Sequence, residues 1–154
     1  MSEVRFLYTS CVLPFLLSSL VAFLLSVLGT FLVNGFLHAR IPLVGSFVGF
    51  ERSVNPGIAF GVRLPTLLQA ALTAAALLVV FLLAWKGKQS RFQQAAYGLI
   101  AGGALANIVD RIPDGVVTDF IQVGSFPVFN VADSCITVGV VLLLVESVWR
   151  RGEE

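Results

Sequence analysis

Residues 102–144 read GGALANIVDRIPDGVVTDFIQVGSFPVFNVADSCITVGVVLLL, and this stretch decides the fold class. It places four of the chain's nine acidic residues among apolar runs. A carboxylate beside the hydrocarbon core of a membrane is costly, so acidic residues in such a setting usually serve a function. Asp119, in Thr-Asp-Phe-Ile, and Asp133, in Ala-Asp-Ser-Cys-Ile, have apolar residues on both sides. We interpret these two aspartates as one catalytic pair.

The composition of the whole chain indicates an integral membrane protein. Of its 154 residues, 57% are hydrophobic and 12% are charged, against roughly a quarter charged in soluble domains. The mean hydropathy is +0.93. The net charge of +1, without a basic stripe, predicts no nucleic-acid partner. Cys11 and Cys135 lie in apolar segments without metal or redox spacing, so we expect buried, inert thiols.

Four apolar segments predict an all-α membrane protein with four transmembrane helices in a single domain, residues 1–154. The uncharged run from Phe6 to Leu37 exceeds the ~20 residues that a spanning helix needs. It is also longer than the apolar core of a signal peptide, about 7–15 residues, so we expect it to remain in the mature chain. Gly98, Gly102 and Ala106 recur every four residues, a pattern typical of closely packed membrane helices. The predicted spans are approximately 11–35, 67–85, 94–110 and 131–149.

The segments between these spans predict a small extracytoplasmic β element. Residues 38–66 are rich in proline and glycine and alternate with β-branched or aromatic residues, as short strands and turns do. Residues 116–123 read as one more extended stretch, between two turns. We therefore expect a small sheet, partly inserted, at one membrane face.

The distribution of lysine and arginine predicts the orientation. With a cytoplasmic N-terminus, the inner face holds six basic residues and the outer face four. Both termini are then cytoplasmic, and residues 38–66 and 110–130 share the outer face. This topology brings Asn55 near Asp119 and Asp133. The six inner residues are Arg5, Lys86, Lys88, Arg91, Arg150 and Arg151.

Two carboxyl groups in one site predict aspartic peptide hydrolysis. The two groups cannot both ionise cheaply, so one keeps a proton while the other stays charged. The ionised member can take a proton from a water that attacks a carbonyl, and the protonated member can donate to the developing oxyanion. This chemistry needs no metal and no cofactor. His38 is the chain's one histidine, which disfavours an ordinary zinc site and a Ser–His triad.

Asn130 and Asp133 also have the spacing of a helix cap. Asn is a favoured N-cap, and an acidic residue three positions later matches the capping-box spacing. Capping alone does not explain why Asp119 lies in an equally apolar setting. Because a helix N-terminus favours negative charge, our hypothesis is that Asp133 is the ionised base and Asp119 the protonated acid.

The end of the third predicted helix leaves two interpretations open. Arg111 beside a helix C-terminus suits the helix dipole. Alternatively, Asn107 and Arg111, which are one turn apart on one face, hold the substrate backbone or the lipid headgroup region. We expect Asp110 and Asp114 to pair with Arg111 or to face water.

Four blocks, in order, resemble lipoprotein signal peptidase, the type II signal peptidase family of bacteria. In the family, the second block has the form Gly-Gly-Ala-x-x-Asn-x-x-Asp-Arg, and the last two carry the catalytic aspartates. The blocks here are Asn55-Pro-Gly-Ile-Ala-Phe60, Gly102-Gly-Ala-Leu-Ala-Asn-Ile-Val-Asp-Arg111, Val116-Val-Thr-Asp-Phe-Ile121 and Phe129-Asn-Val-Ala-Asp-Ser134.

The resemblance implies an aspartic endopeptidase of the bacterial inner membrane. Such an enzyme removes the signal peptide of a prolipoprotein before a diacylglyceryl-modified cysteine, at the outer face and among membrane lipids. Asp119 and Asp133 would be catalytic, with no metal and no cofactor, and we expect a monomer. The residues that would support the pair or the substrate are Asn55, Asn107, Arg111 and Asn130.

One departure from the family keeps two alternatives open. The family's polar Asp-x-x-Thr-Lys signature in the first span reads Val27-Leu-Gly-Thr-Phe31 here, which keeps only the threonine. The first alternative is a non-catalytic, lipoprotein-binding paralogue. The second is a small membrane protein that conducts ions or protons and uses Asp119 and Asp133 as its site.

Overall fold

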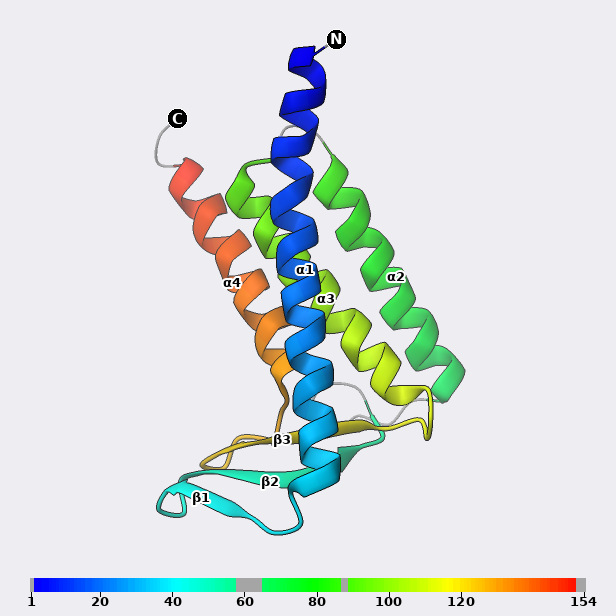
Figure 1. Ribbon diagram of the computed structural model, residues 1–154, viewed down its shortest axis with the longest axis vertical. Helices are drawn as coiled ribbons and strands as arrows, with labels where there is room; N and C mark the ends of the chain where they lie inside the picture. Colours follow the sequence, from blue (N-terminus) through cyan, green and yellow to red (C-terminus); the bar gives the residue numbers. More distant parts are fainter. Residues whose placement is uncertain (1, 58–64, 87–88, 152–154) are drawn as a thin grey trace.

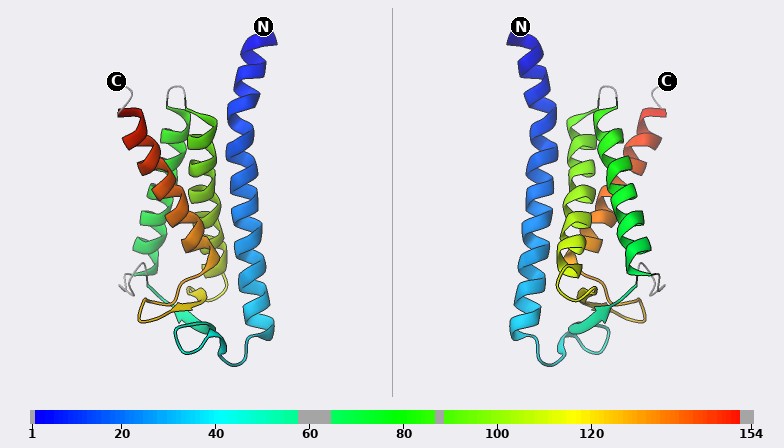
Figure 2. Two further views of the ribbon diagram at one scale, coloured as in Figure 1. Left: turned by 90° about the vertical axis from the view of Figure 1, so that its left-hand side faces the viewer. Right: turned by 90° about the vertical axis from the view of Figure 1, so that its right-hand side faces the viewer.

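Four helices run side by side, and a three-stranded sheet crosses one end of them (Figures 1 and 2). The structure is a computed structural model that describes residues 2–57, 65–86 and 89–151. Both ends of the chain lie at the end of the molecule away from the sheet. The elements are α1 (Ser2–Phe36), β1 (Ile41–Val44), β2 (Val48–Asn55), α2 (Thr66–Trp85), α3 (Arg91–Arg111), β3 (Val117–Val123) and α4 (Val131–Arg151).

The helices agree with the four predicted apolar segments, with differences at their ends. α3 begins at Arg91, before the predicted residue 94. A capping box causes this earlier start: Ser90 Oγ accepts from the Gln93 backbone N–H at 3.0 Å, and Gln93 Oε1 accepts from the Ser90 N–H at 3.0 Å. α1 also begins well before residue 11, at Ser2.

Glycines let the helix backbones approach closely. A Cβ on Gly102 would overlap the carbonyl oxygen of Ser19 in α1, and one on Gly98 would overlap the carbonyl of Phe15. A Cβ on Gly103 would lie 2.6 Å from the Ala132 carbonyl oxygen of α4. The predicted close packing at the small residues of α3 is therefore confirmed, and α3 lies between α1 and α4.

The outer surfaces of the helices are apolar. Leu16, Leu20, Leu24 and Leu28, one turn apart on α1, are each more than half exposed. Such a surface suits lipid rather than water. Within the described residues, two helices are long and apolar enough to cross a membrane, Val12–Phe36 and Val131–Arg150, and a shorter apolar stretch covers Ala71–Trp85.

The sheet forms from the two segments that the sequence predicts to be extended. β1 and β2 form a hairpin whose turn contains Gly45 at φ 51°, a conformation that glycine adopts readily. β2 pairs antiparallel with β3, and the register shifts between Phe50 and Ser53. The predicted short strands within 38–66 are confirmed at β1 and β2, while residues 58–64 lie outside the described residues.

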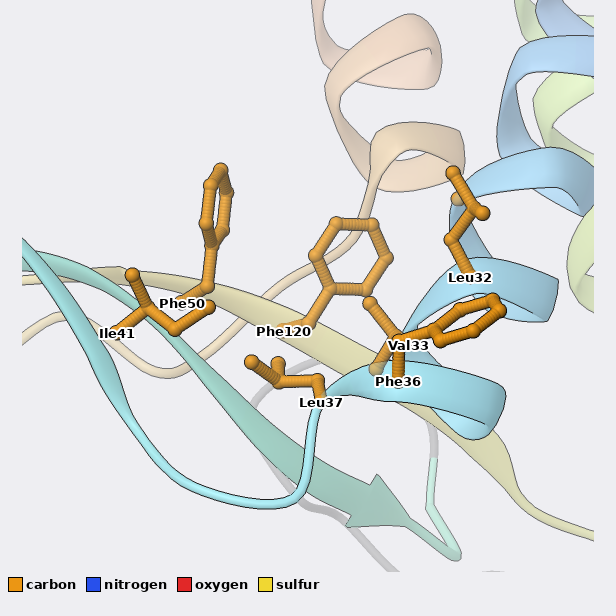
Figure 3. A pocket seen from close by; sticks show the side chains of 8 residues that line it. Leu32, Val33, Phe36, Leu37, Ile41, Phe50 and Phe120 are labelled. Carbon is orange, nitrogen blue, oxygen red and sulfur yellow. The ribbon is translucent and has the colours of Figure 1, made fainter.

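An aromatic and aliphatic cluster anchors the sheet to the end of α1. Val33 and Leu37 are buried together with Phe120 of β3. An open apolar hollow of about 250 Å³ adjoins this cluster (Figure 3). Its lining residues are Gly29, Leu32, Val33, Phe36, Leu37, Ile41, Phe50 and Phe120. The cluster fixes β3, and with it the strand that carries Asp119, against α1.

Candidate active site

Asp119 and Asp133 meet at one asparagine. Asp119 lies in β3 and is 2% exposed, whereas Asp133 lies half-buried in the first turn of α4. Asn130 Nδ2 donates to Asp119 Oδ1 at 2.9 Å, and the Asn130 backbone N–H donates to Asp133 Oδ2 at 3.4 Å. Two aspartates from different elements, β3 and α4, thus both contact Asn130.

The predicted helix cap is confirmed at the same residue. The Asp133 backbone N–H donates to Asn130 Oδ1 at 2.9 Å, which with the 3.4 Å bond in the other direction makes a reciprocal cap at the start of α4. Asn130 therefore caps α4 with its oxygen and holds Asp119 with its nitrogen. The capping and site interpretations do not exclude each other.

Two further asparagines each serve one aspartate. Asn55, the last residue of β2, donates from Nδ2 to Asp119 Oδ2 at 3.1 Å. Asn107 of α3 donates from Nδ2 to Asp133 Oδ1 at 2.9 Å, and its Oδ1 accepts from Asn130 Nδ2 at 3.1 Å. The structure thus brings together five predicted site residues through side-chain amides, which are neutral donors to carboxylates.

The turn after β2 fixes the orientation of Asn55. The Gly57 backbone N–H donates to Asn55 Oδ1 at 3.0 Å, so the amide nitrogen faces Asp119. Gln69 of α2, 3% exposed, donates from Nε2 to the Pro56 carbonyl at 3.0 Å and holds the same turn. Sequence reasoning missed Gln69, although a polar residue within an apolar span is a recognisable signal.

Arg111, the sixth predicted residue, lies at the end of α3 and hydrogen-bonds to the turn after β2. Its Nη1 donates to the Asn107 carbonyl at 3.2 Å and its Nη2 to the Gly57 carbonyl at 2.8 Å. The first bond satisfies a helix C-terminal carbonyl, as one of the two interpretations predicts. Arg111 Nε is buried and has no hydrogen-bond partner among the described residues.

Burial and the neighbouring carboxylate raise the pKa of Asp119 to about 6. Burial is the larger cause, because it penalises the charged form, and the charge of Asp133 adds to it. The amides of Asn55 and Asn130 and the charge of Arg111 act in the opposite direction and lower the pKa. Asp119 therefore holds a proton more readily than an ordinary aspartate.

The remaining acidic residues of the stretch, Asp110 and Asp114, accept hydrogen bonds from backbone N–H groups. Asp110 Oδ2 accepts from the Thr118 backbone N–H at 2.6 Å, and exposed Asp114 accepts from the Val116 N–H at 3.1 Å. The expectation that Asp110 pairs with Arg111 or faces water missed this contact to β3. The described residues contain no group of three or more His, Cys, Asp or Glu side chains placed to hold a metal ion.

Two residues singled out in the sequence, Phe31 and Cys135, lie outside the site. Phe31, at the position of the family's lysine, is 67% exposed on the outside of α1, where an apolar side chain suits lipid. Cys135 is a free, half-buried thiol of α4. Neither residue belongs to the network around Asp119 and Asp133.

This arrangement brings two carboxyl groups of different surroundings into contact with one asparagine. Asp119 lies buried in β3 with its pKa raised, whereas Asp133 lies at the N-terminus of α4. The amides of Asn55, Asn107 and Asn130 orient both groups without adding charge. The site therefore places two hydrogen-bonded carboxyl groups at one end of helices whose outer surfaces are apolar.

Comparisons with known proteins agree on one family. A family model described as Signal peptidase (SPase) II matches residues 18–149. A lipoprotein signal peptidase of Moorella thermoacetica is 31% identical over 147 residues, which cover 92% of this chain and 97% of that protein. A lipoprotein signal peptidase of Chlorobium luteolum is 37% identical over 123 residues, covering 71% of this chain and 74% of that one.

Solved structures share the fold. A bacterial membrane enzyme determined by the in meso method at 2.3 Å superposes with a TM-score of 0.83 over 91% of this chain and 90% of that chain, at 24% identity. A second such enzyme, at 1.9 Å, gives a TM-score of 0.70 over 84% and 90% of the two chains, at 26% identity. The fold described above is thus one that membrane enzymes adopt.

Proposed function

The chain belongs to the signal peptidase II family, and we propose that it is an aspartic endopeptidase whose acid–base pair is Asp119 and Asp133. As a family member it is an integral membrane peptidase that removes the signal peptide from prolipoproteins. The substrate's cysteine carries a diacylglyceryl group in this proposal. The observation that carries the proposal is the joint contact of both carboxylates with Asn130.

In the proposed reaction, each of the two aspartates transfers one proton. Asp133 Oδ accepts a proton from the bound water as the water oxygen attacks the scissile carbonyl carbon, and Asp119 donates its proton to the carbonyl oxygen. The resulting tetrahedral diol collapses when Asp133 passes its proton to the peptide nitrogen, which leaves as the amine, and one diol hydroxyl returns a proton to Asp119. The raised pKa of Asp119, about 6, and the position of Asp133 at the start of α4 support this division of roles.

The asparagines and Arg111 would keep this pair in its working geometry. Asn55 and Asn130 hold the two oxygens of Asp119, and Asn107 holds Asp133. Each amide is itself bonded, so little reorganisation is needed when charge moves. Arg111 would fix the end of α3 relative to the turn after β2, through its bonds to the Asn107 and Gly57 carbonyls.

We also propose a topology for the single domain, residues 1–154. All four helices span the bacterial inner membrane, both termini are cytoplasmic, and the sheet and the aspartates lie at the outer face. Support comes from the lysine and arginine distribution and from the placement of both termini at the end opposite the sheet (Figure 1). A monomer suffices, because one chain supplies every residue of the site.

A lipid-anchored substrate suits this location. Its reacting bond stays at a fixed depth near the membrane surface, so lateral diffusion replaces a three-dimensional search. The exposed apolar surfaces of the helices are compatible with delivery through the lipid. We therefore place the scissile bond at the outer ends of α3 and α4.

A cleavage assay tests the proposal. Purified protein in detergent or vesicles receives a diacylglyceryl-modified precursor, and the variants Asp119→Asn and Asp133→Asn are compared with the wild type. Both variants should lose cleavage by about 1,000-fold or more, because each removes a proton-transfer group. The matched control is Asp114→Asn, an exposed aspartate of the same stretch, which should cleave normally.

Two outcomes would replace the proposal. Binding of the precursor without cleavage by the wild type would favour a non-catalytic paralogue. Ion or proton flux in vesicles that depends on Asp119 and Asp133, without cleavage, would favour a conducting protein. Full activity of either Asp→Asn variant would remove that aspartate from the catalytic pair.

A further inference from the structure

A polar chain of contacts outside the asparagine network reaches the residue next to Asp119. Arg52 of β2 donates from Nε to Asn34 Oδ1 at 2.9 Å. Asn34, in the last turn of α1, donates from Nδ2 to Thr118 Oγ1 at 3.3 Å. The Thr118 backbone N–H donates to Asp110 Oδ2 at 2.6 Å. These contacts, which we call the Thr118 clamp, join four elements.

The clamp acts on a part of β3 that the asparagines do not hold. Thr118 is 4% exposed and immediately precedes Asp119. Successive residues of a strand point to opposite faces, so the two side chains are held from opposite sides of β3. Asn55 and Asn130 fix the carboxylate of Asp119, whereas the clamp fixes the strand from which it projects.

A β-bulge places Arg52 in this chain of contacts. Phe50 pairs with Ile121 and Ser53 with Asp119, so β2 uses one residue more than β3 over the same interval. A bulge of this kind redirects side chains and occurs often beside active sites. Arg52 lies within the bulge, and its side chain reaches α1 instead of following the regular alternation of the strand.

We propose that Asn34 and Arg52 are positioning residues for Asp119, which act through Thr118 and do not touch the substrate. The proposal rests on the aspartic peptidase function proposed above. A carboxyl group that must protonate a carbonyl oxygen needs its strand fixed to within a fraction of an ångström. Loss of the clamp lets β3 shift, so catalysis slows while substrate binding stays the same.

The experiment measures kcat and KM separately for the diacylglyceryl-modified precursor. Asn34→Ala and Arg52→Ala should each lower kcat about tenfold, with KM within about twofold of wild type, because misplacement affects the chemical step. The double variant should be no slower than either single variant, since both act through one contact chain. Asn34→Asp keeps the acceptor for Arg52 and offers a second oxygen that can accept from the Thr118 hydroxyl, which reverses the direction of that bond but retains the contact. This variant should restore kcat to within about twofold.

Arg40 provides the matched control. It also joins an arginine to β3, by donating from Nη2 to Gln122 Oε1 at 2.7 Å, but at the end of the strand remote from Asp119. Arg40→Ala should keep the kcat of wild type. Thermal unfolding of every variant is recorded in the same detergent, and kcat is measured well below the lowest unfolding temperature.

Every outcome of these measurements either supports or overturns the role of the Thr118 clamp. Wild-type kcat in Asn34→Ala or Arg52→Ala, additive losses, a rise in KM alone, or an equal loss in Arg40→Ala would overturn the clamp. Asp119→Asn and Asp133→Asn, assayed in parallel, separate this failure from that of the proposed function. If those two variants are inactive while Asn34→Ala is normal, the peptidase stands and the clamp falls. A wild-type protein that cleaves nothing overturns both.

Discussion

α3 is held against its neighbouring elements in two different ways along its length. Along the middle of α3, contact depends on the absence of side chains at Gly98, Gly102 and Gly103, where the backbones of α1 and of the start of α4 approach. At the outer ends, contact depends on side chains that hydrogen-bond, with three asparagines around two aspartates. The first region sets the distance between helices, and the second sets the geometry of the carboxyl groups.

This difference indicates which region tolerates which change. The glycine contacts are steric and do not depend on pH, so added volume should destabilise them regardless of conditions. The amide network contains an ionisable group in a buried setting, so its energy depends on protonation. Stability and catalysis should therefore respond to different substitutions.

The largest expected effect separates the two roles of Asn130. Asn130→Ser keeps a side-chain acceptor for the Asp133 N–H but cannot reach Asp119. We expect kcat to fall about 100-fold, as when a preorganised donor is removed from a reacting group. The unfolding temperature should stay near that of wild type, and Asn130→Ala should lower both. Wild-type turnover in Asn130→Ser would mean that the bond to Asp119 is dispensable.

The next effect concerns the pH dependence of stability. The pKa of Asp119 is about 6 in the fold against an ordinary 3.8, so the folded state binds this proton more tightly than the unfolded chain. Its contribution to stability is complete below about pH 3.8 and is lost as pH rises through 6. At about 1.4 kcal/mol per pKa unit, the loss is at most about 3 kcal/mol.

Asp119→Asn provides the control for this titration. Wild type should unfold at a lower temperature at pH 7.5 than at pH 5, and the variant should show a smaller drop over the same range. Thermal unfolding in one detergent at both pH values measures this difference. An equal drop in the two proteins would show that Asp119 does not carry the effect.

A smaller effect tests the steric region. Gly102→Ala adds a methyl group against the Ser19 carbonyl and should destabilise the protein by about 1–3 kcal/mol. Gly35→Ala is the matched control, because no atom lies within 4 Å of its added Cβ, and it should be neutral or stabilise by about 0.5 kcal/mol. Equal unfolding temperatures for the two variants would contradict close packing of α1 on α3.

The sequence predicts the apolar part of this molecule well. Hydropathy finds the helices because lipid exposure imposes a compositional signal on every turn, as at Leu20 or Leu24. The repeat at Gly98 and Gly102 predicts close packing because backbone approach requires small residues. The topology predicted from the sequence assigns the segments of Asn55, Asp119 and Asp133 to one face, and the structure joins the three residues through Asn130 and the Asn55 amide.

The remainder depends on distances that no local pattern encodes. The Arg52–Asn34 contact requires a β-bulge, and a bulge follows from the pairing of β2 with β3 rather than from the residues of either strand. The contact of Asp110 with Thr118 joins a helix end to a strand across a turn. Its geometry follows from how α3 and β3 pack, which the residue types of the turn do not specify.

The smallest expected effect is a displacement of the pH profile by Asn55→Ala. The Asn55 amide lowers the pKa of Asp119, because it donates to the carboxylate form. Without it the pKa should rise above 6, so Asp119 keeps its proton to a higher pH. The alkaline limb of kcat/KM, which reports loss of that proton in the free enzyme, should move upward by less than about one pH unit.

Ser53→Ala is the matched control for Asn55→Ala, since Ser53 pairs with Asp119 across the strands and its removal should leave the limb in place. The direction of the displacement decides the assignment of the proton. If Asp119 were the ionised base, loss of Asn55 would move the acidic limb upward and leave the alkaline limb unchanged. Profiles of kcat/KM from pH 4 to 9 for the three proteins distinguish these cases, because only the protonated-acid assignment links Asn55 to the alkaline side.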